Sequence, residues 1–170
     1  MVAWKMVIPH ALIALAHLAI TLLIPLLGIG PAPLWGLLAG WPALSHAVFV
    51  ILYISPQESV GYLGKDVVTG SMAILPTLFF LPPHALQWAT WFIRHTTCIP
   101  LKGEHPYDRV GESGRIFVGR YPMRYPSEFP VDDCSSVVDL TAEFPARQCV
   151  VSGRTYMCLP SLDCEMPPRD

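Results

Sequence analysis

The sequence predicts an α-helical membrane region of two to three transmembrane helices, followed by an incomplete α/β domain. No Lys, Arg, Asp or Glu lies between Lys5 and Glu58, and a second uncharged stretch runs from Val67 to Ile93. Most of the charged residues and all five cysteines follow these stretches. We therefore expect three parts: a transmembrane region at 1–94, a linker at 95–113 and a partial domain at 114–170.

The two uncharged stretches are long enough for three membrane spans. A helix needs about 20 apolar residues to cross a hydrocarbon core of ~30 Å. The sequence Gly28-Ile29-Gly30-Pro31 breaks the first stretch into two, so we place spans near 6–27, 33–54 and 70–93. A cleaved signal peptide and a soluble helical core are the alternatives. The first apolar stretch exceeds the usual signal core of about 7–15 residues, and soluble domains rarely extend so far without a charge.

The third span is interrupted by Pro76, Pro82 and Pro83. Proline removes a backbone donor and kinks a helix, so this segment either crosses as a bent helix or lies at the membrane interface. With three spans, the basic residues after Ile93 outnumber those on the opposite side. The positive-inside rule then predicts an integral, multi-pass protein whose C-terminal region is cytosolic.

Charge and cysteine spacing exclude several classes of function. The net charge of −2 gives no basic field for nucleic acid, so we expect the lipid bilayer, and no nucleic acid, as a partner. There is no Cys-x-x-Cys pair, which argues against a structural zinc site. Unpaired thiols are the simplest interpretation and fit a reducing compartment.

Three short runs in the C-terminal part have the composition of β-strands. They cover 115–119, 136–140 and 155–159, and each is rich in β-branched or aromatic residues. Residues 95–113 are polar and contain prolines and glycines, which is typical of a linker with turns. Strands separated by irregular connections predict the beginning of an α/β or α+β domain.

These three runs, in this order, resemble the opening of a dual-specificity, tyrosine-phosphatase-like domain. The blocks that carry the resemblance are Arg115-Ile-Phe-Val-Gly-Arg-Tyr-Pro, Val137-Val-Asp-Leu-Thr-Ala-Glu-Phe and Tyr156-Met-Cys-Leu-Pro-Ser-Leu-Asp-Cys-Glu-Met-Pro. The resemblance implies a phosphatase-like α/β fold at 114–170. It also implies hydrolysis of phosphate monoesters, on phosphoproteins or phosphoinositide-type lipids, through a cysteinyl-phosphate. Asp163 would then be the general acid that protonates the leaving oxygen.

The nucleophile motif of that family, His-Cys-x5-Arg, does not occur in this sequence. The run from Cys149 to Arg154 comes nearest, but it is one residue short and precedes Asp163. We therefore assign neither a nucleophilic cysteine nor a phosphate-binding arginine, and expect this chain to be cut short before that loop and inactive. Asp163 is otherwise a turn aspartate.

A second interpretation belongs to another class of function. The chain would be a non-catalytic multi-pass membrane adaptor or assembly subunit that retains half a phosphatase fold. An adaptor must hold residues 114–170 folded, either against the spans or against a partner. A truncated enzyme would leave them open to proteolysis.

The spans themselves carry two weaker signals. His10 and His17 share a face of the first span, and with His46 they could ligate haem or bind a quinone. The alternative is that they are neutral histidines with hydrogen bonds between helices, so no cofactor and no metal is assigned. Gly36 and Gly40 form a Gly-x-x-x-Gly motif, which favours helix–helix association.

Overall fold

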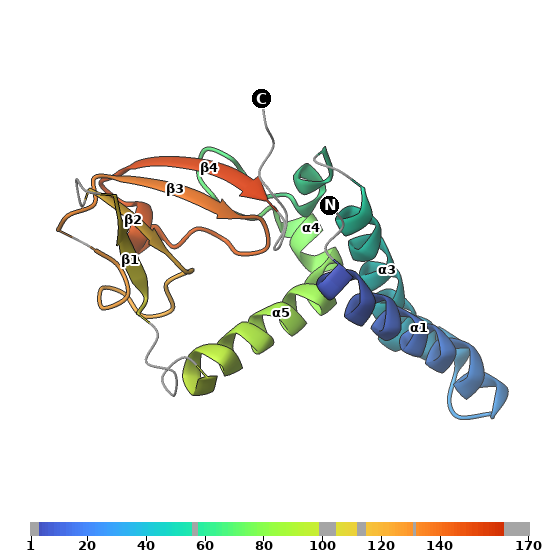
Figure 1. Ribbon diagram of the computed structural model, residues 1–170. Coiled ribbons are helices and arrows are strands. Elements are labelled where there is room, and N and C mark those ends of the chain that lie inside the picture. The colour runs from blue at the N-terminus through green and yellow to red at the C-terminus, as the bar shows by residue number, and fades with distance from the viewer. Residues whose placement is uncertain (1–3, 56–57, 99–104, 112–114, 131, 162–170) are drawn as a thin grey trace.

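The computed structural model describes residues 4–161 except 56–57, 99–104, 112–114 and 131. Its N-terminal third is a helical hairpin whose two arms run side by side in Figure 1. The first arm is α1 (Trp4–Leu26). The second is continuous from α2 (Ala32–Trp35) through a π-helical stretch η1 (Gly36–Gly40) into α3 (Trp41–Ile54).

Both arms have the length and composition of membrane-spanning helices. Trp4–Leu26 and Ala32–Ile54 are each 23 residues long, which matches the span of a bilayer. Gly28 and Gly30 both have φ of 72°, a left-handed conformation that glycine adopts without strain, and they turn the chain between the arms. Most of the large apolar side chains of α1 are exposed. Exposed apolar side chains in such number indicate that lipid, or another apolar partner, surrounds the hairpin.

The segment expected to form a third span is divided into two helices. They are α4 (Ile74–Phe79) and α5 (Leu81–Ile93), and a π-helical turn η3 (Arg94–Cys98) continues α5. Proline is tolerated in the first turn of a helix but not in its interior, so Pro82 and Pro83 begin a new helix. At 1.5 Å per residue, α5 is about 20 Å long, shorter than the bilayer core. Figure 1 shows α5 diverging from the hairpin.

The remaining described residues, 105–161, form what we call the C-terminal module. Strands β1 (Tyr107–Val110) and β2 (Ile116–Gly119) pair antiparallel. Strands β3 (Ser136–Thr141) and β4 (Thr155–Ser161) pair parallel, and the short helix α7 (Gln148–Val151) lies between them in the chain. The strands predicted near 115–119, 136–140 and 155–159 are confirmed. Strand β1 lies within residues 95–113, which the sequence predicted to be a linker with turns. Residues 107–110 of that segment form a strand because they pair with β2.

The described strands form two separate pairs rather than one sheet. The structure therefore shows a small mixed helix and strand region after the hairpin. The buried apolar cluster lies mainly among the helices, and Ala142 of the module packs into it. Buried side chains of both parts make one cluster, namely Val7, Phe49, Leu52, Tyr53, Leu63, Phe80 and Ala142.

Candidate functional site

A buried lysine joins the helical part to the C-terminal module. The Lys65 ammonium donates to Asp139 Oδ2 at 2.8 Å and to Thr141 Oγ1 at 3.0 Å, and also to the Thr141 carbonyl oxygen. The Lys65 side chain is 0% exposed and that of Asp139 12%. A charge is buried in a protein only when it is paired and hydrogen-bonded. Lys65 therefore fixes the position of β3 relative to the helices.

Asp139 is the centre of this polar cluster. Its carboxylate also accepts the Tyr156 hydroxyl at 2.8 Å and the backbone N–H of Thr141 at 2.9 Å. Burial by itself raises the pKa of Asp139, but the hydrogen bond and charge of Lys65, together with Thr141, outweigh it and hold the pKa below its ordinary value. Burial raises the pKa of the neighbouring Cys158 thiol. The cluster thus favours an ionised Asp139 and disfavours a Cys158 thiolate.

Glu143 makes a second set of contacts between the two parts. It is buried, with 3% exposure, and its Oε1 accepts the Tyr53 hydroxyl at 2.7 Å. The Trp88 indole N–H donates to the Glu143 carbonyl oxygen at 3.2 Å. Tyr53 ends α3 and Trp88 lies in α5. One turn of the module after β3 is therefore held by two different helices.

Two further contacts complete the attachment. The Ala146 N–H donates to the Gly70 carbonyl oxygen at 2.8 Å, and His95 lies 2.8 Å from the Glu128 carboxylate with both side chains largely buried. We refer to the contacts of Lys65, Glu143, Gly70 and His95 as the docking interface. It places the C-terminal module firmly on the helical part.

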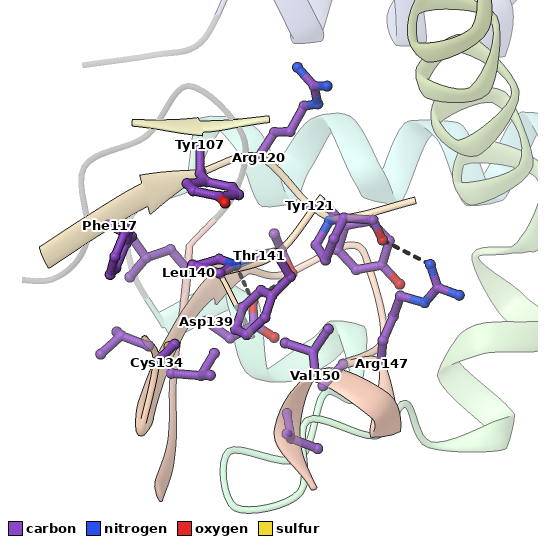
Figure 2. Close-up of a pocket in the computed structure, with 18 of the residues that line it drawn as sticks. Tyr107, Phe117, Arg120, Tyr121, Cys134, Asp139, Leu140, Thr141, Arg147 and Val150 are labelled. Atoms are coloured by element: carbon purple, nitrogen blue, oxygen red, sulfur yellow. Dashed lines mark hydrogen bonds between the residues drawn. The ribbon is translucent and has the colours of Figure 1, made fainter. Parts of the chain in front are cut away.

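A pocket of about 360 Å³ lies within the C-terminal module, between the β1–β2 pair, β3 and α7. Figure 2 shows Tyr121, Asp139, Arg147 and Val150 around it. The Arg147 guanidinium donates to the carbonyl oxygens of Pro122, at 3.0 Å, and of Met123. Its Nη1 nitrogen is therefore engaged with backbone carbonyl oxygens. Burial also raises the pKa of the Tyr121 hydroxyl, so this hydroxyl is neutral.

The histidines of the hairpin are brought together. His10 Nδ1 and His46 Nδ1 lie 2.8 Å apart, which is the distance of a direct hydrogen bond. Metal–imidazole bonds are about 2.0–2.1 Å long, so nitrogens on opposite sides of an iron would be ~4 Å apart. The His17 Nδ1–H donates to the Ile13 carbonyl oxygen at 2.9 Å. The arrangement links α1 to α3 and leaves no room for an ion between His10 and His46.

The other predicted site residues are placed as follows. Asp163 lies outside the described residues, so its role as general acid stays a prediction. An added Cβ at Gly40 would contact Thr21 of α1 at 3.6 Å, and one at Gly36 would meet nothing within 4 Å. Neither glycine is needed for close helix approach within the chain. Helix association between chains through Gly36 and Gly40 stays a prediction.

The remaining reactive groups do not form an obvious centre. Cys134, Cys149 and Cys158 are free thiols, as the sequence predicted. Within the described ranges, no group of three or more His, Cys, Asp or Glu side chains is placed to hold a metal ion. Sequence reasoning missed the docking interface. The sequence signals for it are Asp139 within a strand, Glu143 just after that strand, and Lys65, which is the only Lys or Arg between Lys5 and Arg94.

Comparison of this chain with protein families, with curated proteins and with solved structures finds no match.

Proposed function

We propose that this chain is the membrane-anchored front part of a dual-specificity-phosphatase-like protein. The parent protein would hydrolyse phosphate monoesters, on phosphoproteins or phosphoinositide-type lipids, through a cysteinyl-phosphate. The chain of 170 residues would supply the anchor and the first strands, and would be inactive by itself because it lacks the His-Cys-x5-Arg loop. Asp163 would be the general acid of the complete site.

The observation that carries this proposal is the parallel pairing of β3 with β4. Parallel strands require a crossover connection and belong to α/β domains. Here α7 lies in the connection, and β4 ends at Ser161, two positions before Asp163 in the sequence. A strand followed by a loop bearing an acid is the order that the resemblance implies.

The docking interface also supports a cytosolic placement of the module. Lys65 and Asp139 are in contact, so the chain between them must cross the membrane an even number of times. Segment 70–93 then does not cross as a single span, and both ends of the hairpin lie on one side. The connection at 27–31 carries no charge, whereas Lys5 and Lys65 lie at the opposite end. The positive-inside rule places that end, and the module, in the cytosol.

The test of the phosphatase proposal compares two preparations. The 170-residue chain in lipid nanodiscs is expected to show no vanadate-sensitive hydrolysis of p-nitrophenyl phosphate. The native protein, isolated with an antibody against the module, is expected to be larger and active. In it, Asp163→Asn should lower kcat by about 10²–10⁴-fold, the range for a general acid, and Asp132→Asn, on an exposed loop, should leave it unchanged. A native protein near 18.8 kDa without activity would contradict the proposal.

The second candidate is the non-catalytic adaptor, and the docking interface favours it. An adaptor must keep its module folded, and buried contacts from Lys65, Tyr53 and Trp88 provide a means within the described residues. Hydrogen exchange of the 170-residue chain separates the candidates. Slow exchange in β3 and β4 supports an adaptor, whereas exchange at random-coil rates in both strands would reject it.

A further inference from the structure

A cavity of about 620 Å³ lies where three parts of the chain meet. The start of α1, the middle and end of α5, and the turn after β3 each contribute to its lining. Its volume is within the range of about 300–1,000 Å³ that is usual for small-molecule sites. It adjoins the 360 Å³ pocket of Figure 2, which lies inside the C-terminal module, and the two share Tyr121, Leu140 and Thr141 in their linings.

The cavity is placed at the level of lipid head groups. Lys5 lines it and immediately precedes the uncharged stretch of the first spanning helix. Arg94, at the end of α5, lines it too. Basic residues at the ends of membrane helices lie among the head groups. An apolar wall of the same cavity is formed by Met6, Leu86 and Leu140. The lining therefore suits a ligand that has a charged part and an apolar part.

The charged and aromatic lining is of two kinds. Lys5 and Arg94 are exposed cations, and such side chains bind phosphate through charge-assisted hydrogen bonds. Glu143 is a buried acidic residue in the lining, beside Trp91 and Tyr121. A carboxylate with aromatic faces nearby is the environment that proteins use for ammonium groups. A purely anionic ligand would use the cations but would be repelled by Glu143.

Two lining side chains also have hydrogen-bonding capacity left. The Trp91 indole N–H and the Gln87 amide oxygen are buried atoms without a hydrogen-bond partner among the residues described. An unpaired buried polar atom costs about 1–3 kcal/mol. One is a donor and the other an acceptor, so a ligand that carries both kinds of group is suited to them.

We propose that this cavity binds the head group of a zwitterionic membrane phospholipid. Its phosphate lies toward Lys5 and Arg94, its ammonium group toward Glu143 and the aromatic side chains, and its glycerol and first acyl carbons against Met6 and Leu86. The site requires only that α1 lies in a membrane. It does not depend on whether the parent protein is a phosphatase.

The test is a lipid titration of the full chain in a maltoside detergent, followed by native mass spectrometry. The probes are phosphatidylethanolamine and phosphatidylglycerol with the same acyl chains, and inorganic phosphate. We expect phosphatidylethanolamine to bind at least tenfold more tightly than phosphatidylglycerol, and inorganic phosphate not to compete. Equal binding of the two lipids would overturn the ammonium assignment. Competition by inorganic phosphate at the lipid's own concentration would mean a simple anion site.

Two sets of variants test the contacts of the phosphate and of the ammonium group separately. Lys5→Gln with Arg94→Gln should weaken phosphatidylethanolamine binding by about tenfold or more, the value of one or two charge-assisted bonds. The matched control, Arg109→Gln with Arg124→Gln, removes two exposed cations that do not line the cavity, and binding should stay within twofold. If both double variants bind equally well, the site is not this cavity.

Glu143→Gln tests the ammonium contact. Glutamine keeps an acceptor for the Tyr53 hydroxyl, removes the charge and replaces the second oxygen by an N–H donor, which does not favour an ammonium group. The preference for phosphatidylethanolamine over phosphatidylglycerol should therefore fall to about twofold or less. A preference that persists in a variant with unchanged hydrogen exchange in β3 would refute the role of Glu143.

Discussion

Replacing Lys65 by methionine removes the buried ammonium and leaves the Asp139 carboxylate without its cation. Methionine has nearly the same length, so the packing volume is kept. Removing one partner of a buried ion pair costs about 3–5 kcal/mol, because the remaining charge stays desolvated. At 1.36 kcal/mol per tenfold change, the equilibrium constant for opening of the docking interface should rise by roughly two to nearly four orders of magnitude.

The assay is hydrogen exchange of the β3 and β4 amides in nanodiscs, where amides that exchange by undocking should speed up by that factor. Arg109→Met is a matched control. Arg109 is also 2.8 Å from a carboxylate, that of Asp133, but their side chains are 62% and 55% exposed. An exposed pair is worth about 0–1 kcal/mol, so exchange should change less than about fivefold. The nitrogen–oxygen distance is the same in both ion pairs, so the difference in exchange rate between the two variants reports the effect of burying the pair.

A double variant decides whether the unpaired charge is the cause. Lys65→Met with Asp139→Asn removes both charges and keeps an acceptor for Tyr156. Its stability should return to within about 1–2 kcal/mol of the original chain, because neutral replacement of a whole buried pair is often tolerated. Unchanged exchange in Lys65→Met, or no recovery in the double variant, would refute the reasoning.

Three other outcomes are expected of the docking interface. The pKa of Asp139 is lowered on folding from its ordinary value of 3.8, so the ionised carboxylate stabilises the docked module above that pH. This stabilisation is lost as the pH falls through the folded pKa. Hydrogen exchange measured between about pH 5 and pH 2 should show the loss, and the Asp139→Asn variant should not show it. Tyr53→Phe removes the hydroxyl bonded to Glu143 and should cost about 1–3 kcal/mol in urea titrations. Gly70→Ala should destabilise more than Gly111→Ala, because both have positive φ but only at Gly70 does a Cβ meet other side chains; equal melting temperatures of the two variants would contradict this.

The helical hairpin and the three strands were predictable because their signals are local. Charge-free stretches, the Gly28–Pro31 break and runs of β-branched residues are each contained within a short window. Strand β1 was missed because two of its four residues, Asp108 and Arg109, are charged, and pairing with β2 outweighs the weak strand preference of its own sequence. The division of segment 70–93 into two helices follows from Pro82 and Pro83. The sequence indicated that these prolines interrupt the helix, but not that each resulting helix is too short to cross a bilayer.

The docking interface could not be predicted from one sequence, because its partners lie far apart in the chain. Lys65 and Asp139 are separated by 74 positions, and Tyr53 and Glu143 by 90. Local patterns carry no information about which distant residues meet. Lys65 was interpreted as a charge that flanks the membrane, a role that any basic residue fills. Its pairing with a buried carboxylate requires lysine or arginine at that position and a fixed distance from β3.

The 74 positions between the two partners of the buried ion pair have a consequence for biosynthesis. When Lys65 leaves the ribosome, the hairpin has already been made, whereas Asp139 does not yet exist. In the proposed two-span topology, the module therefore completes its folding after the hairpin has inserted, on the face of the bilayer where Lys65 lies. A chain in which segment 70–93 crossed the bilayer as a span would leave the ammonium and the carboxylate on opposite faces. Quality-control proteases would then recognise such molecules by their unprotected module.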